Sequence, residues 1–176
     1  MQVKDKTFKL YIPEEAIKEA VLRVAQQINT DYRGKKVIFL GVLNGAFMFA
    51  SDLLKEIDLT CEISFVKLSS YKGTTTSTGE VHELVGLTTD IKDKHVIILE
   101  DIVDSGLTLD KLYSMIVLHS TKSVEVATLL YKPEAFKGKT PPKYIGIEIE
   151  NKFIVGYGLD YQEEGRNTKA IYQITE

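Results

Sequence analysis

The sequence predicts an α/β fold with a mostly parallel central sheet flanked by helices, and three observations lead to this class. Short, uninterrupted apolar runs, typical of strands covered on both faces, alternate with amphipathic segments of helical spacing. The length of 176 residues, 44% of them hydrophobic, suits one buried core. No repeat or linker marks a second domain, so a single domain over residues 1–176 is expected.

The first predicted element is an amphipathic helix that begins near Pro13. Proline suits the first turn of a helix, and the acids Glu14 and Glu15 follow it directly. The helix is expected to end before Gly34. Apolar residues recur along it at helical spacing: Ala16, Ile17, Ala20, Val21, Val24 and Ile28.

The alternation of strands and helices continues along the chain. Strands are predicted at 35–43, 61–69, 95–101 and 123–131, and helices at 45–57 and 108–120. After Pro141 and Pro142, two more short strands are expected around the turn at Glu150 and Asn151.

The segment 69–80 interrupts this pattern, because it is rich in Ser, Thr and Gly and has no apolar periodicity. Such a composition is typical of a surface connection. Long segments of this kind inside compact domains are also often lids or binding loops. Tyr71 is the one aromatic residue of the segment.

Charge and cysteine content narrow the possible partners and compartments. The net charge of -3 provides no basic field for nucleic acid or an anionic membrane, so neither partner is expected. The single cysteine, Cys61, excludes an internal disulfide framework and a multi-cysteine zinc site, and it favours the cytoplasm. With no leader-like segment and no membrane-length apolar run, a soluble, unprocessed protein is expected.

The stretch "VIILEDIVDSGLTLD", residues 96–110, places acids at the end of an apolar strand. In open α/β sheets, ligands bind at the carboxyl ends of strands, beside the N-terminus of the following helix. Gly106 allows a tight turn, and Ser105 and Thr108 offer hydroxyl groups to a phosphate.

The acids of this stretch complete a predicted ribose 5-phosphate site. Glu100 and Asp101 could accept hydrogen bonds from sugar hydroxyls or hold a hard cation with its water shell. Asp104 is then available for proton transfer. The alternative is that Asp104 or Ser105 only caps a helix, which explains one acid but not three. The P-loop and dinucleotide-binding glycine signatures are absent.

This stretch resembles the 5-phosphoribosyl-1-pyrophosphate (PRPP) binding motif of the phosphoribosyltransferases. Its Glu-Asp start is similar to that of the 6-oxopurine branch, the hypoxanthine (guanine) phosphoribosyltransferases. Three further segments match in order, so the resemblance covers nearly the whole chain: "GVLNGAFMF", "SSYKGTTTSTG" and "LLYKPE…KFIVGYGLDYQEEGR". The resemblance implies a type I phosphoribosyltransferase-like fold with a small hood subdomain from the N-terminal and C-terminal segments.

The resemblance also implies roles at the PRPP site. Glu100 and Asp101 would bind the ribose hydroxyls, directly or through Mg²⁺, and Asp104 would be the general base or acid at the purine N7 position. The 5′-phosphate would lie in the turn formed by Asp104, Ser105, Gly106, Leu107 and Thr108.

The turn of Leu43, Asn44 and Gly45 resembles the family's pyrophosphate loop, where a strained, often cis, peptide bond presents backbone N–H groups. The family often has lysine at the position of Asn44, so only backbone contacts are expected there. A plain helix N-cap is the alternative for Asn44. Arg166 would reach the pyrophosphate, although the sequence alone would make it a surface arginine.

Ser70 and Tyr71 match the family's flexible lid, here about 69–80, whose closure would exclude water from the reacting centre.

The purine site is implied by four residues. Lys132 would donate to the purine O6 oxygen, Phe153 would stack on the base, and Ile154 would offer backbone groups to the amidic edge. Asp160 would help to bind a second Mg²⁺ through water. Without the resemblance, Lys132 would be a solvated lysine, and Phe153 and Ile154 would be strand core.

The implied activity is purine salvage: Mg²⁺-dependent transfer of the 5-phosphoribosyl group from PRPP to hypoxanthine and/or guanine, giving IMP or GMP and pyrophosphate. Relatives form dimers or tetramers, which implies a homo-oligomer. Two other classes stay open. A regulatory protein on this fold would keep the phosphate turn without turnover. An aspartyl phosphotransferase also uses acids after a strand, but its D-x-D spacing is missing.

Overall fold

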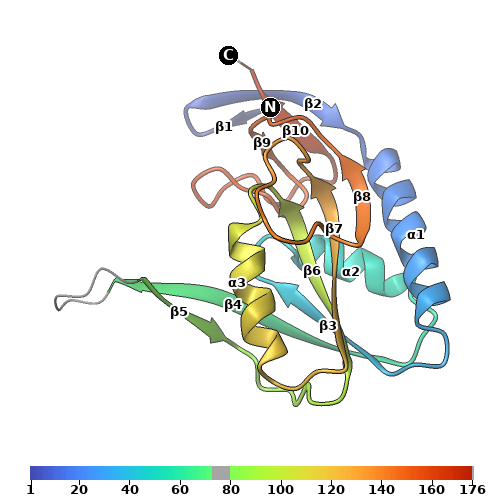
Figure 1. Ribbon diagram of the computed structural model, residues 1–176. Helices are drawn as coiled ribbons and strands as arrows, with labels where there is room; N and C mark the ends of the chain where they lie inside the picture. The colour runs from blue at the N-terminus through green and yellow to red at the C-terminus, as the bar shows by residue number, and fades with distance from the viewer. Residues whose placement is uncertain (73–79, 176) are drawn as a thin grey trace.

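The structure is a computed structural model that describes residues 1–72 and 80–175, and within it the side chains of 69–85 are not described. The described chain forms two sheets (Figure 1). The central sheet has the strand order β5-β4-β3-β6-β7-β8. Its strands are β3 (Val37–Val42), β4 (Cys61–Lys72), β5 (Glu80–Val85), β6 (His95–Val103), β7 (Ser123–Tyr131) and β8 (Tyr144–Glu148).

The order in which the chain enters the parallel strands of the central sheet creates a switch point. Strands β4, β3, β6, β7 and β8 are parallel, and β5 is an antiparallel edge strand. From β3 the chain moves to β4 on one side and later returns to β6 on the other side. A crevice at the carboxyl ends of β3 and β6 is the usual ligand position in such a sheet.

In the part of the chain that the structure describes, three helices cover the central sheet. Helices α1 (Glu14–Asp31) and α2 (Phe47–Lys55) pack on one face, and α3 (Leu107–Val117) packs on the other (Figure 1). Alternate residues of β3 enter the two cores because successive side chains of a strand point to opposite faces. Val37 and Phe39 belong to the α1–α2 core, whereas Ile38 and Leu40 belong to the α3 core.

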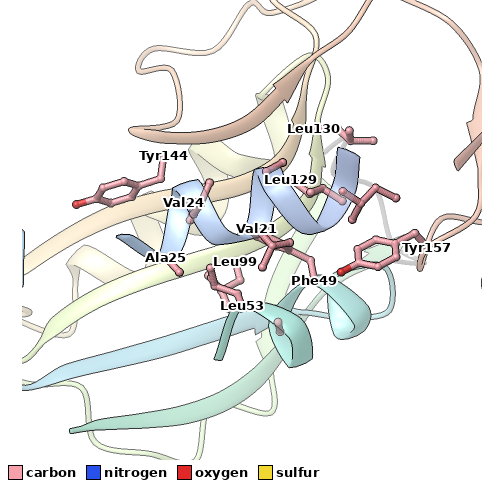
Figure 2. Close-up of a cluster of buried hydrophobic side chains, with 14 of the residues drawn as sticks. Val21, Val24, Ala25, Phe49, Leu53, Leu99, Leu129, Leu130, Tyr144 and Tyr157 are labelled. Atoms are coloured by element: carbon pink, nitrogen blue, oxygen red, sulfur yellow. The ribbon is translucent and has the colours of Figure 1, made fainter. Parts of the chain in front are cut away.

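The core between α1, α2 and the sheet is fully apolar at its centre. Val21 and Val24 of α1, Phe49 and Leu53 of α2, and Leu99 of β6 belong to this one cluster (Figure 2). The amphipathic helix expected from the sequence is confirmed, because its buried residues are the apolar ones at helical spacing.

The hood expected from the resemblance is confirmed, and both chain termini build it. Strands β1 (Gln2–Val3), β2 (Lys6–Ile12), β10 (Ile171–Ile174) and β9 (Ile154–Val155) form an antiparallel sheet in this order. Val3, Phe8 and Val155 form its small core. Figure 1 shows this sheet above the carboxyl ends of β6 and β7.

The sequence prediction differs from the structure around residue 70. Strand β4 continues to Lys72 and pairs antiparallel with β5, whereas the sequence predicted a structureless loop from residue 69. An edge hairpin is held by backbone hydrogen bonds, so Ser69 and Ser70 need no apolar periodicity to pair with β5. Residues 73–79 of the expected lid lie outside the described residues. Strand β5 was not predicted.

Within the described residues, the structure contains no helix with the length and apolar character needed to cross a membrane.

Candidate active site

A pocket of 240 Å³ lies at the carboxyl end of β6, beside the start of α3. It brings together most of the residues predicted to hold a ribose phosphate. Asp101 is not part of its lining, and the side chain of Leu107 is largely exposed. The lining residues are Val42, Glu100, Ile102, Val103, Asp104, Ser105, Gly106, Thr108 and Leu109.

The turn before α3 is a tight glycine turn that packs against Phe136. Gly106 has a φ of 77°, and the ring of Phe136 occupies the space where a β-carbon would lie. The N–H of Lys137 donates to the Ser105 carbonyl at 2.9 Å, which braces the turn from outside. The N-cap of α3 is Gly106, so Asp104 does not cap this helix. The hydroxyl of Ser105 lies 3.5 Å from the N–H of Leu107.

Glu100 and Asp101 are adjacent acids with perturbed protonation. Burial, followed by the negative charge of Asp101, raises the pKa of the Glu100 carboxyl well above its usual range. Burial raises the pKa of Asp101 to about 6, although the N–H of Ile102 donates to it at 2.9 Å and Arg166 opposes the rise. The charge of Asp160 contributes to raising the same pKa. Because ionisation of both carboxyls is costly here, binding of a cation beside them would be favourable.

The turn after β3 lies against Asp101. The Leu43–Asn44 peptide bond is cis, as the resemblance implied. Gly45 has no side chain, and a β-carbon there would overlap the Asp101 carboxylate. Asn44 is exposed, and the N-cap of α2 is Ala46, so Asn44 is not the cap of that helix.

Lys132 follows β7 and is buried. Its ammonium group donates to Asp104 at 2.7 Å and to the side-chain oxygen of Asn151 at 3.4 Å. The Lys132 N–H also donates to the Val103 carbonyl at 3.0 Å, which fixes the end of β7 to the end of β6. Lys132 is therefore not a solvated surface lysine.

The hood holds a partly exposed aromatic group, Phe153. Phe153 is 47% exposed, and its ring packs on Phe8 and Tyr161 with centroid distances of 6.3 and 5.8 Å. Ile154, the next residue, is buried in β9. One side of the Phe153 ring is thus supported by protein while much of it remains accessible.

Arg166 is held by a network of its own. Its guanidinium contacts Asp160 at 2.9 Å and Glu163 at 3.2 Å, and it donates to the Gly158 carbonyl at 2.8 Å. The side chain is 21% exposed, so Arg166 is not a free surface arginine. The positive charge of Arg166 also acts to lower the pKa of Asp101.

Comparison with known protein families shows which family the chain belongs to. The sequence model described as "Phosphoribosyl transferase domain" matches residues 12–162. The chain belongs to the phosphoribosyl transferase family.

Members of the family with high similarity include bacterial proteins. The hypoxanthine-guanine phosphoribosyltransferase of Staphylococcus aureus strain Mu50 is 41% identical over 160 residues, 91% of this chain and 89% of that protein. The bifunctional protein TilS/HprT of Listeria monocytogenes serotype 4b is 39% identical over 163 residues, 93% of this chain but 25% of that protein.

Solved structures of family members share the fold over the full chain. The crystal structure of a hypoxanthine-guanine phosphoribosyltransferase from Bacillus anthracis superposes with a TM-score of 0.88 at 37% identity, covering 97% of this chain and 100% of that one. A mutant hypoxanthine phosphoribosyltransferase from Trypanosoma cruzi, in a ternary substrates complex, gives 0.86 at 30% identity, covering 98% and 97%.

Ser70 and Tyr71, which the resemblance assigned to a lid, are described only through their backbone. Ser70 and Tyr71 lie in β4, paired with His82 and Val81 of β5. Their side chains, like residues 73–79, fall outside what the structure describes.

The possible metal ligands at the candidate site are carboxylate oxygen atoms of Asp and Glu. Among the described residues, no group of three or more His, Cys, Asp or Glu side chains is already assembled around one position. Mg²⁺ usually keeps several waters and is bound by one or two carboxylates together with substrate phosphates. Glu100, Asp101 and Asp160 offer carboxylates that fit this mode of binding.

The sequence did not predict two residues, Asn151 and Phe136, that contact residues of the candidate site. Asn151 accepts a hydrogen bond from Lys132 across 19 residues of chain. Phe136 packs against Gly106 and makes an edge contact with Tyr131, with ring centroids 5.5 Å apart. Neither residue has a local signal, because each acts through a contact that only the folded chain creates.

Proposed function

We infer that the chain is a hypoxanthine-guanine phosphoribosyltransferase of purine salvage. It transfers the 5-phosphoribosyl group from PRPP to hypoxanthine and/or guanine, giving IMP or GMP and pyrophosphate. One observation carries this inference: Glu100 of β6, the turn before α3 and buried Lys132 meet at the switch point of a chain whose relatives bear this name. In the reaction, N9 of the base displaces pyrophosphate from C1′ of the ribose.

We propose that PRPP binds with its 5′-phosphate in the turn of residues 104–108. The backbone N–H groups at the start of α3 and the hydroxyls of Ser105 and Thr108 suit a phosphate. Glu100 and Asp101 would then accept hydrogen bonds from the hydroxyls of the ribose. The pocket beside the turn, of 240 Å³, supports this placement because Glu100 lines it together with the turn.

The base would bind between Lys132 and Phe153. Lys132 donates to the O6 oxygen, which suits a 6-oxopurine and disfavours the amino group of adenine. Phe153 stacks on the ring, and the backbone of Ile154 meets the amidic edge. Asp104 takes the proton from purine N7 as N9 attacks. The contact between Lys132 and Asp104 at 2.7 Å supports roles for both at one base.

The leaving pyrophosphate would be held by backbone groups of Leu43, Asn44 and Gly45 and by the guanidinium of Arg166. A guanidinium is a fixed fork of donors, which suits a phosphate. Closure of Ser70 and Tyr71 would exclude water during the step. These groups supply position and electrostatic stabilisation rather than covalent chemistry.

Mg²⁺ is the cofactor that the family implies, and we propose that Glu100, Asp101 and Asp160 help to hold it. When bound, it would neutralise developing charge on the pyrophosphate. Burial of Glu100 and Asp101, with their raised pKa values, supports this, since a divalent cation would compensate the cost of two adjacent buried carboxylates. A homo-oligomer, dimer or tetramer, and a cytoplasmic location are proposed on the resemblance and the single cysteine.

The test is a steady-state assay with PRPP and Mg²⁺, in which hypoxanthine, guanine, xanthine and adenine are offered separately. Turnover of hypoxanthine or guanine with little turnover of adenine is expected. Asp104→Asn should lower kcat by about 100-fold or more, because the carboxylate no longer accepts the N7 proton. Asp58→Asn changes an exposed acid far from the site in sequence and should leave kcat unchanged.

A different result would redirect the inference. If no base reacts while PRPP or a nucleotide still binds, the protein is a regulatory member of the family rather than an enzyme.

A further inference from the structure

The hydroxyl of Tyr157 joins two parts of the molecule that are distant in sequence. It donates to the carboxylate of Asp52 at 2.7 Å across 105 residues. Tyr157 lies between β9 and Arg166 in sequence, whereas Asp52 belongs to α2. Tyr157 is 4% exposed, and burial together with this hydrogen bond raises its pKa, so the group remains a neutral donor.

Each partner of this hydrogen bond is attached to one side of the proposed pyrophosphate site. Asp52 lies in α2, the helix that directly follows the turn of residues 43–45. Tyr157 is followed by Gly158, whose N–H donates to the Arg166 carbonyl at 2.9 Å and whose carbonyl accepts from the Arg166 guanidinium at 2.8 Å.

The two sides also meet directly. A β-carbon on Gly158 would overlap the carbonyl of Gly45, so the backbones of the two segments are in contact. Gly158 has a φ of 99° and Tyr157 a φ of 50°, so this short segment has an unusual path. Because neither glycine has a side chain, this contact alone does not fix the position of one segment against the other. The Tyr157 hydroxyl supplies a directional link beside it.

We propose that Tyr157 and Asp52 are positioning residues that hold Arg166 and the turn of residues 43–45 at the spacing required by pyrophosphate. This proposal rests on the proposed function and extends it to residues that do not touch the substrate. Loss of the hydrogen bond would let the two sides separate, and PRPP would bind less tightly. Binding of the purine base, which depends on Lys132 and Phe153, would change little.

The chain contains a matched control for this hydrogen bond. Tyr144 is 2% exposed and donates to Asp31 of α1 at 2.8 Å, so it has the same donor, acceptor and burial. Tyr144 and Tyr157 lie at opposite ends of the same buried cluster (Figure 2). Tyr→Phe at either position removes one buried hydroxyl, but only Tyr157 is attached to the proposed pyrophosphate site.

The experiment compares wild type, Tyr157→Phe and Tyr144→Phe by KM for PRPP, KM for hypoxanthine, kcat and Tm. Tyr157→Phe should raise the KM for PRPP about five- to tenfold, which is less than the full effect of one lost hydrogen bond to a carboxylate, because Tyr157 acts on PRPP only through the spacing of the two sides. Its KM for hypoxanthine should stay within about twofold of wild type. Both variants should lower Tm by a similar amount, because each loses one buried hydrogen bond. Tyr144→Phe should leave the KM for PRPP unchanged.

Variants of Asp52 give a second, independent measurement. Asp52→Asn keeps an oxygen acceptor for the Tyr157 hydroxyl and should retain the wild-type KM for PRPP. Asp52→Ala should match Tyr157→Phe, and the double variant should be no worse than either single variant, because all three lack the same bond.

The outcomes separate the two claims. An active wild type with equal KM values for PRPP in Tyr157→Phe and Tyr144→Phe overturns the positioning role alone. Additive effects in the Tyr157→Phe, Asp52→Ala double variant overturn it as well. A wild type that turns over no base overturns the proposed function, and the positioning role falls with it.

Discussion

Lys132 and Asp104 form a salt bridge of 2.7 Å between the ends of β7 and β6, and the two side chains differ sharply in exposure. The Lys132 side chain is 8% exposed and that of Asp104 is 49% exposed. The buried ammonium therefore has its charge compensated by a carboxylate that a ligand can reach. A base entering the site would meet both groups at once, one as a donor and the other as a proton acceptor.

Lys132→Met should abolish the preference for 6-oxopurines. The variant keeps the length of the side chain but has no donor for O6, so kcat/KM for hypoxanthine should fall about 10- to 100-fold. The ratio of hypoxanthine to adenine turnover should fall by a similar factor. Lys122→Met, an exposed lysine at the opposite end of β7, is the control and should change neither value. An unchanged ratio in Lys132→Met would show that base choice lies elsewhere.

Asp101→Asn should stabilise the ligand-free protein near neutral pH. Because the folded-state pKa of Asp101 is raised to about 6, the folded chain holds a proton that the unfolded chain releases above about pH 4. The carboxyl thus lowers stability as pH rises from about 4 to about 6. The variant should gain about 3 kcal/mol at pH 7 and little at pH 4.

Thermal unfolding of wild type and Asp101→Asn at both pH values measures this effect. Asp58→Asn, which changes an exposed acid, is the control variant. If Asp101 helps to hold Mg²⁺ as proposed, addition of PRPP with Mg²⁺ should raise the Tm of wild type more than that of Asp101→Asn. A gain at pH 4 as large as that at pH 7 would contradict the assigned cause.

Gly45→Ala should impair PRPP binding because the new methyl group would collide with the Asp101 carboxylate. We expect the KM for PRPP to rise more than about tenfold, since either the turn or the acid must move. Gly34→Ala is the control: its φ of 73° disfavours alanine, but no atom lies within 4 Å of the added carbon. That variant should lose about 1 kcal/mol of stability and keep its turnover. Equal kinetics in the two variants would contradict the crowding argument.

Phe153→Ala should weaken binding of the base selectively. Loss of one stacking ring should raise the KM for hypoxanthine about three- to tenfold while the KM for PRPP stays constant. Tyr113→Ala, a 40% exposed ring on α3, is the matched control. Fluorescence or calorimetric titration with GMP would check the same loss at equilibrium. A parallel rise of both KM values in Phe153→Ala would indicate a disturbed hood rather than lost stacking.

Much of the fold follows from local patterns that the sequence displays. The alternating cores on the two faces of β3 and β6 come from continuous apolar runs, and α1 comes from its helical spacing of apolar residues. Strand β7 was predicted with the bounds that the structure shows. Such elements are predictable because their pattern lies within one short segment and each apolar residue must be buried.

Tertiary structure alone decided which distant residues meet. No local pattern joins Tyr157 to Asp52 or Lys132 to Asn151, because these contacts depend on the placement of elements that are far apart in the chain. The extension of β4 to Lys72 likewise depended on pairing with β5, and not on apolar spacing. The sequence by itself determined which groups are available at each strand end. Packing of the sheets determined their distances, burial and pKa values, which arise from neighbours in space.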